Sequence, residues 1–297
     1  MLREVLEWLA IRPDGTYVDA TLGLGGHSIE IARRLTTGKL IGIDRDPQAL
    51  EIARERLKEF ESKVTLVNAK FSQIEEVTKK LKVIPIDGVV ADLGVSSMQL
   101  DRPERGFSFR YEGPLDMRMD PQEMETASEI VNRMEEKQLA DLIYKYGEEH
   151  DSRRIARAIV RSRPIRDTEH LATVVAGAVK TRGRQKLHPA TKTFLALRIA
   201  VNRELEELGQ FLSTTPATLA PGARWAVMSY HSLEDRMVKH EFQRLHKQGT
   251  LHILTKKVVQ PGEEELAANP RARSAKLRVA ERTTKPLEFE PEGPEAA

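Results

Sequence analysis

Hydrophobic and polar positions follow two alternating periods through the first hundred residues. Four short apolar runs have the length of buried strands: residues 16–21, 39–44, 64–67 and 86–92. Between them, residues 27–35 and 47–60 carry apolar side chains at helical spacing, and Pro47 suits the first turn of a helix. Strands and helices that alternate in this way predict a parallel sheet with helices on both faces.

The pattern changes after residue 100. Residues 102–121 are rich in glycine, proline and charge, which is typical of a long loop. From about residue 127 only helical periods follow, most clearly in residues 135–146, 153–163, 168–179 and 190–212. We therefore expect a helical insertion domain over residues 105–214.

The strand pattern then returns. An apolar run at residues 223–229 precedes a helical period at 233–246. Two alternating segments, residues 250–259 and 275–282, predict an antiparallel pair with a loop between them. The expected fold class is thus α/β, with one discontinuous domain over residues 1–104 and 215–285. Residues 286–297 form an acidic, proline-rich tail.

Composition narrows the class of protein. The 297 residues are 40% hydrophobic and 31% charged, which describes a folded globular chain. No apolar run approaches the roughly 20 residues of a membrane span, and the N-terminus lacks a signal-peptide pattern. The chain has no cysteine, which excludes disulfides, thiolate metal sites and cysteine nucleophiles. We expect a cytoplasmic protein.

The net charge of +2 hides three basic clusters. Their members are Arg153, Arg154, Arg157, Arg161, Arg163 and Arg166; then Lys180, Arg182, Arg184 and Lys186; then Arg271, Arg273, Lys276, Arg278 and Arg282. Any one cluster can be a solvated helix face. Three together favour a nucleic-acid partner.

A glycine-rich turn follows the first expected strand. Residues 18–28 read Val-Asp-Ala-Thr-Leu-Gly-Leu-Gly-Gly-His-Ser, and Asp44 ends the next strand 21 positions after Gly23. Glycines let the backbone approach a ligand, and an acid at that strand end can accept hydrogen bonds from a ribose diol. The alternatives are an ordinary tight turn and a helix cap, although Asp46 is better placed to cap.

Two details favour S-adenosylmethionine over NAD. Ser28 stands where the dinucleotide fingerprint has its third glycine. Asp92, at the end of the fourth strand, suits a cationic aminoacyl ligand better than an anionic pyrophosphate. Phe71 follows the third strand, and its position fits an adenine contact and a core aromatic equally.

A third group of polar residues follows the strand at 223–229. His231 and Glu234 lack a third ligand at suitable spacing, so we expect no metal site. Ser232 to Asp235 fits a capping box for the next helix. His231 remains a candidate substrate contact.

Seven motifs in order resemble those of a known family: Gly-Leu-Gly-Gly-His-Ser, Gly-Ile-Asp-Arg-Asp-Pro, Asp-Leu-Gly-Val-Ser-Ser, Arg-Gly-Phe-Ser-Phe, Pro-Leu-Asp-Met-Arg-Met, His-Ser-Leu-Glu-Asp-Arg and Asn-Pro-Arg-Ala-Arg-Ser-Ala-Lys-Leu-Arg. The sequence closely resembles the RsmH (MraW) family, which methylates the exocyclic N4 amine of a cytidine in the 16S ribosomal RNA of the small subunit. The resemblance covers residues 2–282. The family's usual His-x-Pro-Val segment before the first helix does not occur in this sequence.

The resemblance implies a Rossmann-like methyltransferase sheet whose helical insertion recognises the substrate. It implies S-adenosylmethionine as the cofactor, 16S rRNA as the partner and the basic clusters as RNA contacts. It also implies that Phe71 lies beside adenine. The cofactor contacts carried over are Gly25, Gly26, His27, Asp44, Phe71, Asp92 and Gln99. Asp92 is the catalytic candidate: on this resemblance, Asp92, or the carbonyl of Leu93, would accept a hydrogen bond from the cytidine amine.

Three other functions fit parts of the sequence. A DNA amino-methyltransferase usually has a Pro-Pro-aromatic stretch where Leu93-Gly94-Val95 stands. A non-catalytic RNA-binding ribosome-assembly factor can retain the same fold. An NAD oxidoreductase is disfavoured by Ser28 and Asp92. The oligomeric state stays open.

Overall fold

The computed structural model describes residues 1–179 and 187–284, which form two compact units. Among these residues, the first unit comprises Met1–Asp44, Gln48–Gly94 and residues 207–284, and the second comprises Arg45–Pro47 and residues 95–179 and 187–206. The second unit thus begins earlier than the expected residue 105 and ends before 214. The reason is packing: Val95 and Leu100 contact the apolar core of the helical unit.

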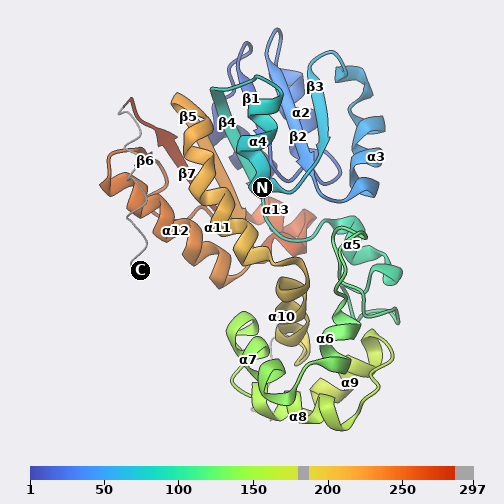
Figure 1. The fold of residues 1–297 in the computed structure, drawn as a ribbon. Helices are drawn as coiled ribbons and strands as arrows, with labels where there is room; N and C mark the ends of the chain where they lie inside the picture. The colour runs from blue at the N-terminus through green and yellow to red at the C-terminus, as the bar shows by residue number, and fades with distance from the viewer. Residues whose placement is uncertain (180–186, 285–297) are drawn as a thin grey trace, which may run out of the picture. The chain divides into compact units, whose positions relative to one another are not determined.

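A seven-stranded sheet forms the centre of the first unit (Figure 1). Its strands are β1 (Thr16–Asp19), β2 (Lys39–Asp44), β3 (Val64–Asn68), β4 (Ile86–Asp92), β5 (Leu219–Ser229), β6 (Leu251–Ile253) and β7 (Lys276–Arg282). Their order is β3-β2-β1-β4-β5-β7-β6. The first five strands in this order are parallel to one another, and β7 pairs antiparallel with both β5 and β6. The predicted parallel sheet and the closing antiparallel pair are confirmed.

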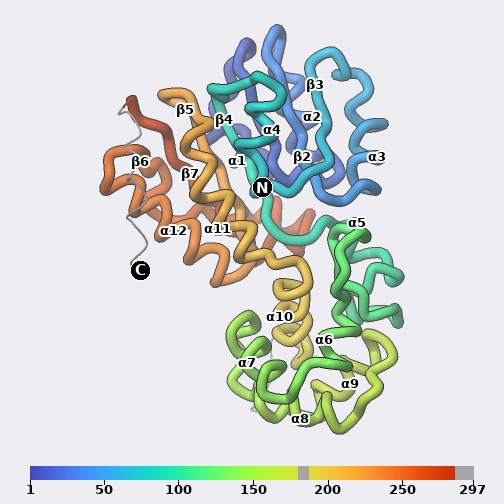
Figure 2. Tube along the Cα trace, viewed as in Figure 1, coloured from blue at the N-terminus to red at the C-terminus, as the bar shows by residue number. Residues whose placement is uncertain are grey.

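Helices cover both faces of this sheet. They are α1 (Leu2–Leu9), α2 (Gly26–Arg34), α3 (Pro47–Arg56), α4 (Ile74–Lys80), α11 (Glu204–Thr214), α12 (Ser232–Lys247) and the short α13 (Glu263–Ala268). In Figure 1, α4, α11 and α12 lie in front of the sheet, and the tube of Figure 2 shows α1 on the other side. Proline at the start of α3 confirms the predicted first turn.

Alternating side chains divide between these two layers. On β4, Val89 and Ala91 join the core beneath α4, α11 and α12, whereas Val90 joins the core beneath α1 and α2. Trp225 and Ala226 on β5 divide in the same way. A strand buried on both faces reads as a continuous apolar run, which is why the sequence revealed it. The arrangement is the expected Rossmann-like α/β fold.

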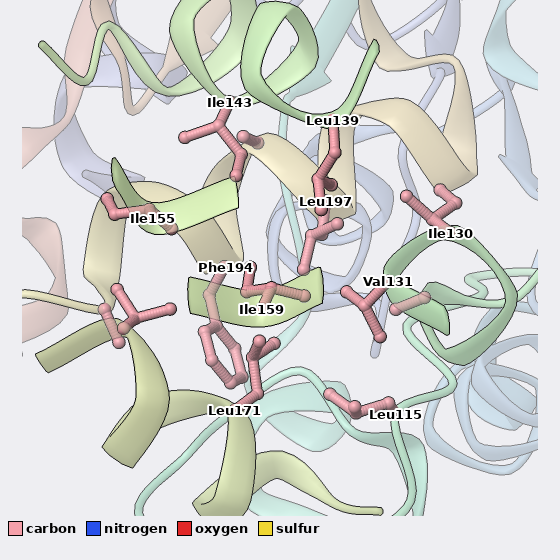
Figure 3. Packing of buried hydrophobic residues seen from close by; sticks show 14 of the residues in the cluster. Leu115, Ile130, Val131, Leu139, Ile143, Ile155, Ile159, Leu171, Phe194 and Leu197 are labelled. Carbon is pink, nitrogen blue, oxygen red and sulfur yellow. The ribbon is translucent and has the colours of Figure 1, made fainter. Parts of the chain in front are cut away.

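The second unit is helical. It contains α5 (Ser97–Asp101), α6 (Ala127–Arg133), α7 (Glu136–Gly147), α8 (Ser152–Arg161), α9 (Thr168–Ala178) and α10 (Thr191–Asn202). Figure 3 shows its aliphatic core, where Leu139 and Ile143 of α7, Ile155 and Ile159 of α8 and Phe194 of α10 point toward one another. These residues recur at helical spacing, so each helix buries one face.

The single helix expected over residues 190–212 is wrong, because the chain divides it at Arg203. Arg203 adopts a left-handed conformation, with φ 48° and ψ 37°, and ends α10. The side chain of Asn202 donates to the Met117 carbonyl at 2.7 Å and accepts from the Met119 amide at 2.7 Å. These long-range bonds hold the end of α10.

Among the described helices, none has both the length and the apolar character that crossing a membrane requires.

Candidate active site

Three aspartates stand at the carboxyl ends of neighbouring strands in the first unit. Asp19 ends β1, Asp44 ends β2 and Asp92 ends β4. Because β1 lies between β2 and β4 and all three strands are parallel, these ends meet at one edge of the sheet. Ligands of open parallel sheets bind outside that edge.

Asp44 fixes the glycine turn that follows β1. Its Oδ2 accepts a hydrogen bond from the Gly23 amide at 2.7 Å. Gly25 then caps α2 with φ 78°, a conformation that glycine adopts without the strain of a Cβ atom. Among the described residues no side chain caps α2, and a Cβ atom added at Gly26 would meet nothing within 4 Å. The helix therefore presents backbone N–H groups toward open space, an arrangement suited to a ligand carboxylate.

Asp92 is held by two hydroxyl groups. Its backbone amide donates to Thr21 Oγ1 at 2.6 Å, and the Tyr230 hydroxyl donates to its Oδ1 at 2.8 Å. The Nδ1 of His27 lies 4.0 Å from Asp92 Oδ2. Burial raises the pKa of the Asp92 carboxyl above its ordinary value, although His27 and the Tyr230 hydrogen bond act in the opposite direction.

Asp19 is a buried acid that the sequence analysis did not single out. It accepts hydrogen bonds from Ser28 Oγ at 2.8 Å and from the Thr21 amide at 3.3 Å. Burial raises its pKa too, against the lowering effect of His27. Ser28, singled out only as a missing glycine, thus ties α2 to β1. The burial of both residues is visible only in the structure, so the sequence held no signal for this bond.

His27 acts electrostatically on both Asp19 and Asp92. Its ring lies near Asp92, and its Nε2 atom is buried without a hydrogen-bond partner among the described residues. A buried polar atom without a partner costs free energy unless a ligand or a water satisfies it. His27 therefore has an atom to offer to a bound molecule.

Phe71 and Gln99 are placed differently from the other expected contacts. Phe71 opens the turn after β3, is 9% exposed and packs edge-on against Phe211. Gln99 lies on α5 of the second unit and is also buried. Its Nε2 donates to Asp46 at 2.9 Å and its Oε1 accepts from the Ser96 amide at 3.0 Å. Both side chains thus also have structural contacts.

The residues at this edge fit S-adenosylmethionine. The uncapped start of α2 suits a carboxylate, Asp44 stands where a ribose diol would need an acceptor, and Asp92 offers negative charge to a cationic ligand. The orphan nitrogen of His27 adds a hydrogen-bonding atom. A pyrophosphate would meet the repulsion of Asp19 and Asp92, two acids interacting through their charges.

The basic clusters prove to be mixed. In the third cluster, Lys276 and Arg278 pair with Asp235, and Arg282 is buried and donates to the Thr250 carbonyl at 3.1 Å. In the first, Arg163 donates to backbone carbonyls at Val131 and Met134. The exposed members include Arg153, Arg161, Arg166 and Arg273. The second cluster, residues 180–186, lies outside the described residues.

The cap of α12 differs from the sequence expectation. The N-cap is His231 and not Ser232, since His231 Nδ1 accepts from the Glu234 amide at 3.4 Å. Glu234 Oε2 in turn accepts from the Tyr230 amide at 2.9 Å. The reciprocal pair resembles a capping box shifted by one residue. Tyr230, which sequence reasoning missed, is thereby fixed at the end of β5.

Comparison with known proteins identifies relatives over nearly the whole chain. A Ribosomal RNA small subunit methyltransferase H from Koribacter versatilis is 52% identical over 291 residues, covering 94% of this chain and 92% of that protein. The protein of the same name from Solibacter usitatus is 52% identical over 281 residues, covering 95% and 98%.

The solved structures that match are more distant. A putative rRNA methylase from Clostridium thermocellum is 13% identical with a TM-score of 0.47, covering 96% of this chain and 94% of that one. An rRNA methylase from Streptococcus thermophilus is 12% identical with a TM-score of 0.46, covering 95% and 96%. Neither likeness bears on the site.

A family model described as the MraW methylase family matches residues 1–283. That match includes the glycine turn, all three strand-end aspartates and the whole helical unit. The chain belongs to the MraW methylase family.

Proposed function

We propose that this protein transfers the methyl group of S-adenosylmethionine to the exocyclic N4 amine of a cytidine in 16S rRNA of the small ribosomal subunit. The relatives' printed name supports the RNA substrate. The placement of Asp92 carries the chemistry: an acid at the end of β4 with a raised pKa and one oxygen held by a neutral phenol.

The cofactor would be held by residues of the first unit. Asp44 would accept from the ribose hydroxyls, and Gly25, Gly26 and His27 would surround the aminoacyl end at the start of α2. Phe71 would offer its small exposed edge to adenine. Gln99 belongs to the second unit, where it donates to Asp46, and it stays an expected cofactor contact on the family resemblance alone. The bound sulfonium supplies an electrophilic methyl group, so the protein has no need to create one.

Asp92 would act on the substrate amine. The lone pair of a cytosine amine is conjugated with the ring, and a hydrogen bond from that amine to Asp92 makes the lone pair more available. With S-adenosylmethionine bound, the amine would receive the methyl group and S-adenosylhomocysteine would leave, and Asp92 or water would accept the proton that the amine releases. Alignment contributes most of the rate, because the proton leaves after attack. The cytidine must be unstacked to reach the site.

The second unit would serve the RNA. Arg153 and Arg161 on α8 and Arg166 beyond it are exposed, and α8 packs its apolar face into the unit's core. An insertion can recognise a large substrate while the strand-end site keeps the cofactor. Phosphate contacts of this kind supply affinity and orientation more than sequence recognition.

Labelled S-adenosylmethionine and small ribosomal subunits that lack the modification provide the test. After digestion, chromatography of the nucleosides should place the label in N4-methylcytidine. Naked 16S rRNA and duplex DNA are the comparison substrates. Label in DNA alone would favour an amino-methyltransferase of DNA, and cofactor binding with no transfer would favour a non-catalytic assembly factor. Either outcome contradicts the proposal.

A further inference from the structure

Tyr230 lies beside Asp92 because of the register between β4 and β5. Asp92 pairs with Met228, and the Leu93 amide donates to the Met228 carbonyl at 3.0 Å. Tyr230 follows directly after β5, and its side chain packs against the same core that contains Met228. The contact joins residues 138 positions apart.

The position of Tyr230 is fixed from two directions. Its amide donates to Glu234 at the start of α12, and its ring packs against the core that contains Tyr17 and Leu277. Its hydroxyl then has a defined partner, Asp92 Oδ1 at 2.8 Å. A ring held in this way can restrict the rotation of the carboxylate that it contacts.

We propose that Tyr230 is a positioning residue for methyl transfer, whose hydroxyl holds Asp92 Oδ1 so that Oδ2 receives the hydrogen bond of the substrate amine. This inference rests on the proposed function, since it assigns Asp92 to the amine. Oδ2 is the oxygen that lies toward His27, at 4.0 Å from its Nδ1. In this arrangement Oδ1 accepts a hydrogen bond from the protein, and Oδ2 accepts one from the substrate.

The hydroxyl also affects the protonation of Asp92. Several charged or titratable groups act on this carboxyl or on Tyr230 itself: His27 on α2, Asp19 on β1, Glu234 on α12, Glu265 on α13 and the N-terminal ammonium of Met1. In addition to these groups, the hydrogen bond from Tyr230 favours the charged form of Asp92, in which both carboxylate oxygens are acceptors. Burial raises the pKa of the Tyr230 phenol, and the negative charge of Asp92 raises it further. The phenol therefore remains a donor at neutral pH.

Tyr230→Phe keeps the ring and removes the donor. Without that donor the charged form of Asp92 loses a stabilising bond, so the pKa of Asp92 should rise further. The acid limb of the pH–rate profile should move to higher pH with it. At pH values above the acid limbs of both the wild type and the variant, the variant should still be roughly tenfold slower, because its carboxylate is less well oriented. The affinity for S-adenosylmethionine should change little.

Tyr17→Phe is the matched control. Tyr17 packs in the same core, its pKa is likewise raised by burial, and its hydroxyl accepts from the Arg12 amide at 2.7 Å, away from Asp92. A loss of stability common to both variants is structural. The shift of the acid limb should appear only in Tyr230→Phe.

The experiment measures single-turnover methylation of small subunits against pH for the wild type and both variants. The Asp92 carboxyl is also titrated by carbon-13 NMR without RNA. An unchanged acid limb and an unchanged Asp92 titration in Tyr230→Phe would overturn the inference. Absence of methylation by the wild type would instead overturn the proposed function, and the NMR titration would still test the Tyr230 contact.

Discussion

Asp92 and Asp235 are two partly buried carboxyls of the first unit with opposite surroundings. Asp235 on α12 accepts from Arg278 Nε at 2.7 Å and from Lys276 Nζ at 3.3 Å. Burial alone would raise its pKa, but the two cations outweigh burial and lower it. Asp92 meets a neutral phenol and, at 4.0 Å, an imidazole, and burial prevails in raising its pKa.

This difference indicates that Asp235 has a structural role, whereas Asp92 is suited to bind a ligand. Asp235 uses both oxygens on cations of β7 and so pins that strand to α12. Asp92 has one oxygen held and its charge poorly compensated, which is the condition in which a carboxyl binds a cationic or hydrogen-donating ligand. The comparison also explains why the third basic cluster is not simply a surface for RNA: part of its charge is already used.

The largest expected effect is that of Asp92→Asn. The amide keeps the shape of the side chain but loses the charge that draws the amine hydrogen. Methylation at saturating cofactor should slow about 100-fold, or about 2.7 kcal/mol. Single-turnover rates measure it, with Asp235→Asn as the control. If Asp235→Asn slowed transfer as much as Asp92→Asn, the division between the two acids would fail.

Asp44→Ala should weaken cofactor binding without a matching loss of fold. It leaves ribose hydroxyls without their acceptor and releases the Gly23 amide, at a cost of about 2 kcal/mol, roughly 30-fold in affinity. Calorimetry measures this. Asp87→Ala is the matched control, because Asp87 also accepts a backbone amide, that of Thr16 at 2.7 Å, near the opposite end of β4. Equal affinities in the two variants would refute the ribose assignment.

The contributions of Asp235 and Asp92 to folding stability should depend on pH in opposite directions. The lowered pKa of Asp235 means that its contribution is fully present above the ordinary aspartate value of 3.8 and is lost as pH falls through the folded-state pKa. The raised pKa of Asp92 gives the reverse: its contribution is present at low pH and lost as pH rises through the folded-state value.

At neutral pH, Asp235→Asn should therefore destabilise the fold by about 1 kcal/mol, a figure reduced for partial solvent screening. Asp92→Asn should be neutral or stabilising. Denaturant unfolding at pH 7 measures both. If Asp92→Asn destabilised the fold as much as Asp235→Asn, the two carboxyls would not contribute to stability in opposite ways, and the prediction would be wrong.

The smallest effect concerns salt. Arg273 is exposed, whereas Lys276 pairs with Asp235. Arg273→Gln should reduce the slope of log affinity for RNA against log salt by somewhat under one unit, as the loss of one phosphate contact does. Lys276→Gln should change it less. Equal changes in the two slopes would show that the pairing leaves Lys276 as available to phosphate as Arg273.

Much of the fold could be predicted because buried parallel strands are continuous apolar runs. β2 ends at Asp44 and β4 at Asp92, as the sequence indicated, so two acids of the site could be placed from local pattern. The glycine turn could be placed for the same reason. The break of the long helix at Arg203 could not, because it is fixed by bonds from Asn202 to a loop some 85 residues away.

The partners of charged residues were also beyond local pattern. Tyr230 reaches Asp92 only through the pairing of β4 with β5, and no spacing along the chain reveals it. Counting arginines likewise cannot distinguish Arg273 on the surface from buried Arg282. Charge predicts a partner for a region, whereas tertiary contacts decide which of its residues remain available.

One measurement tests the contrast between the two acids most directly: carbon-13 titration of the aspartate carboxyls in the wild-type protein without cofactor or RNA. Asp92 should titrate above the ordinary aspartate value and Asp235 below it. Assignments come from the loss of each resonance in Asp92→Asn and Asp235→Asn. If Asp92 titrated at or below the value of Asp235, the carboxyl at the end of β4 would be as well compensated as a structural ion pair, and its assignment to the chemistry would be contradicted.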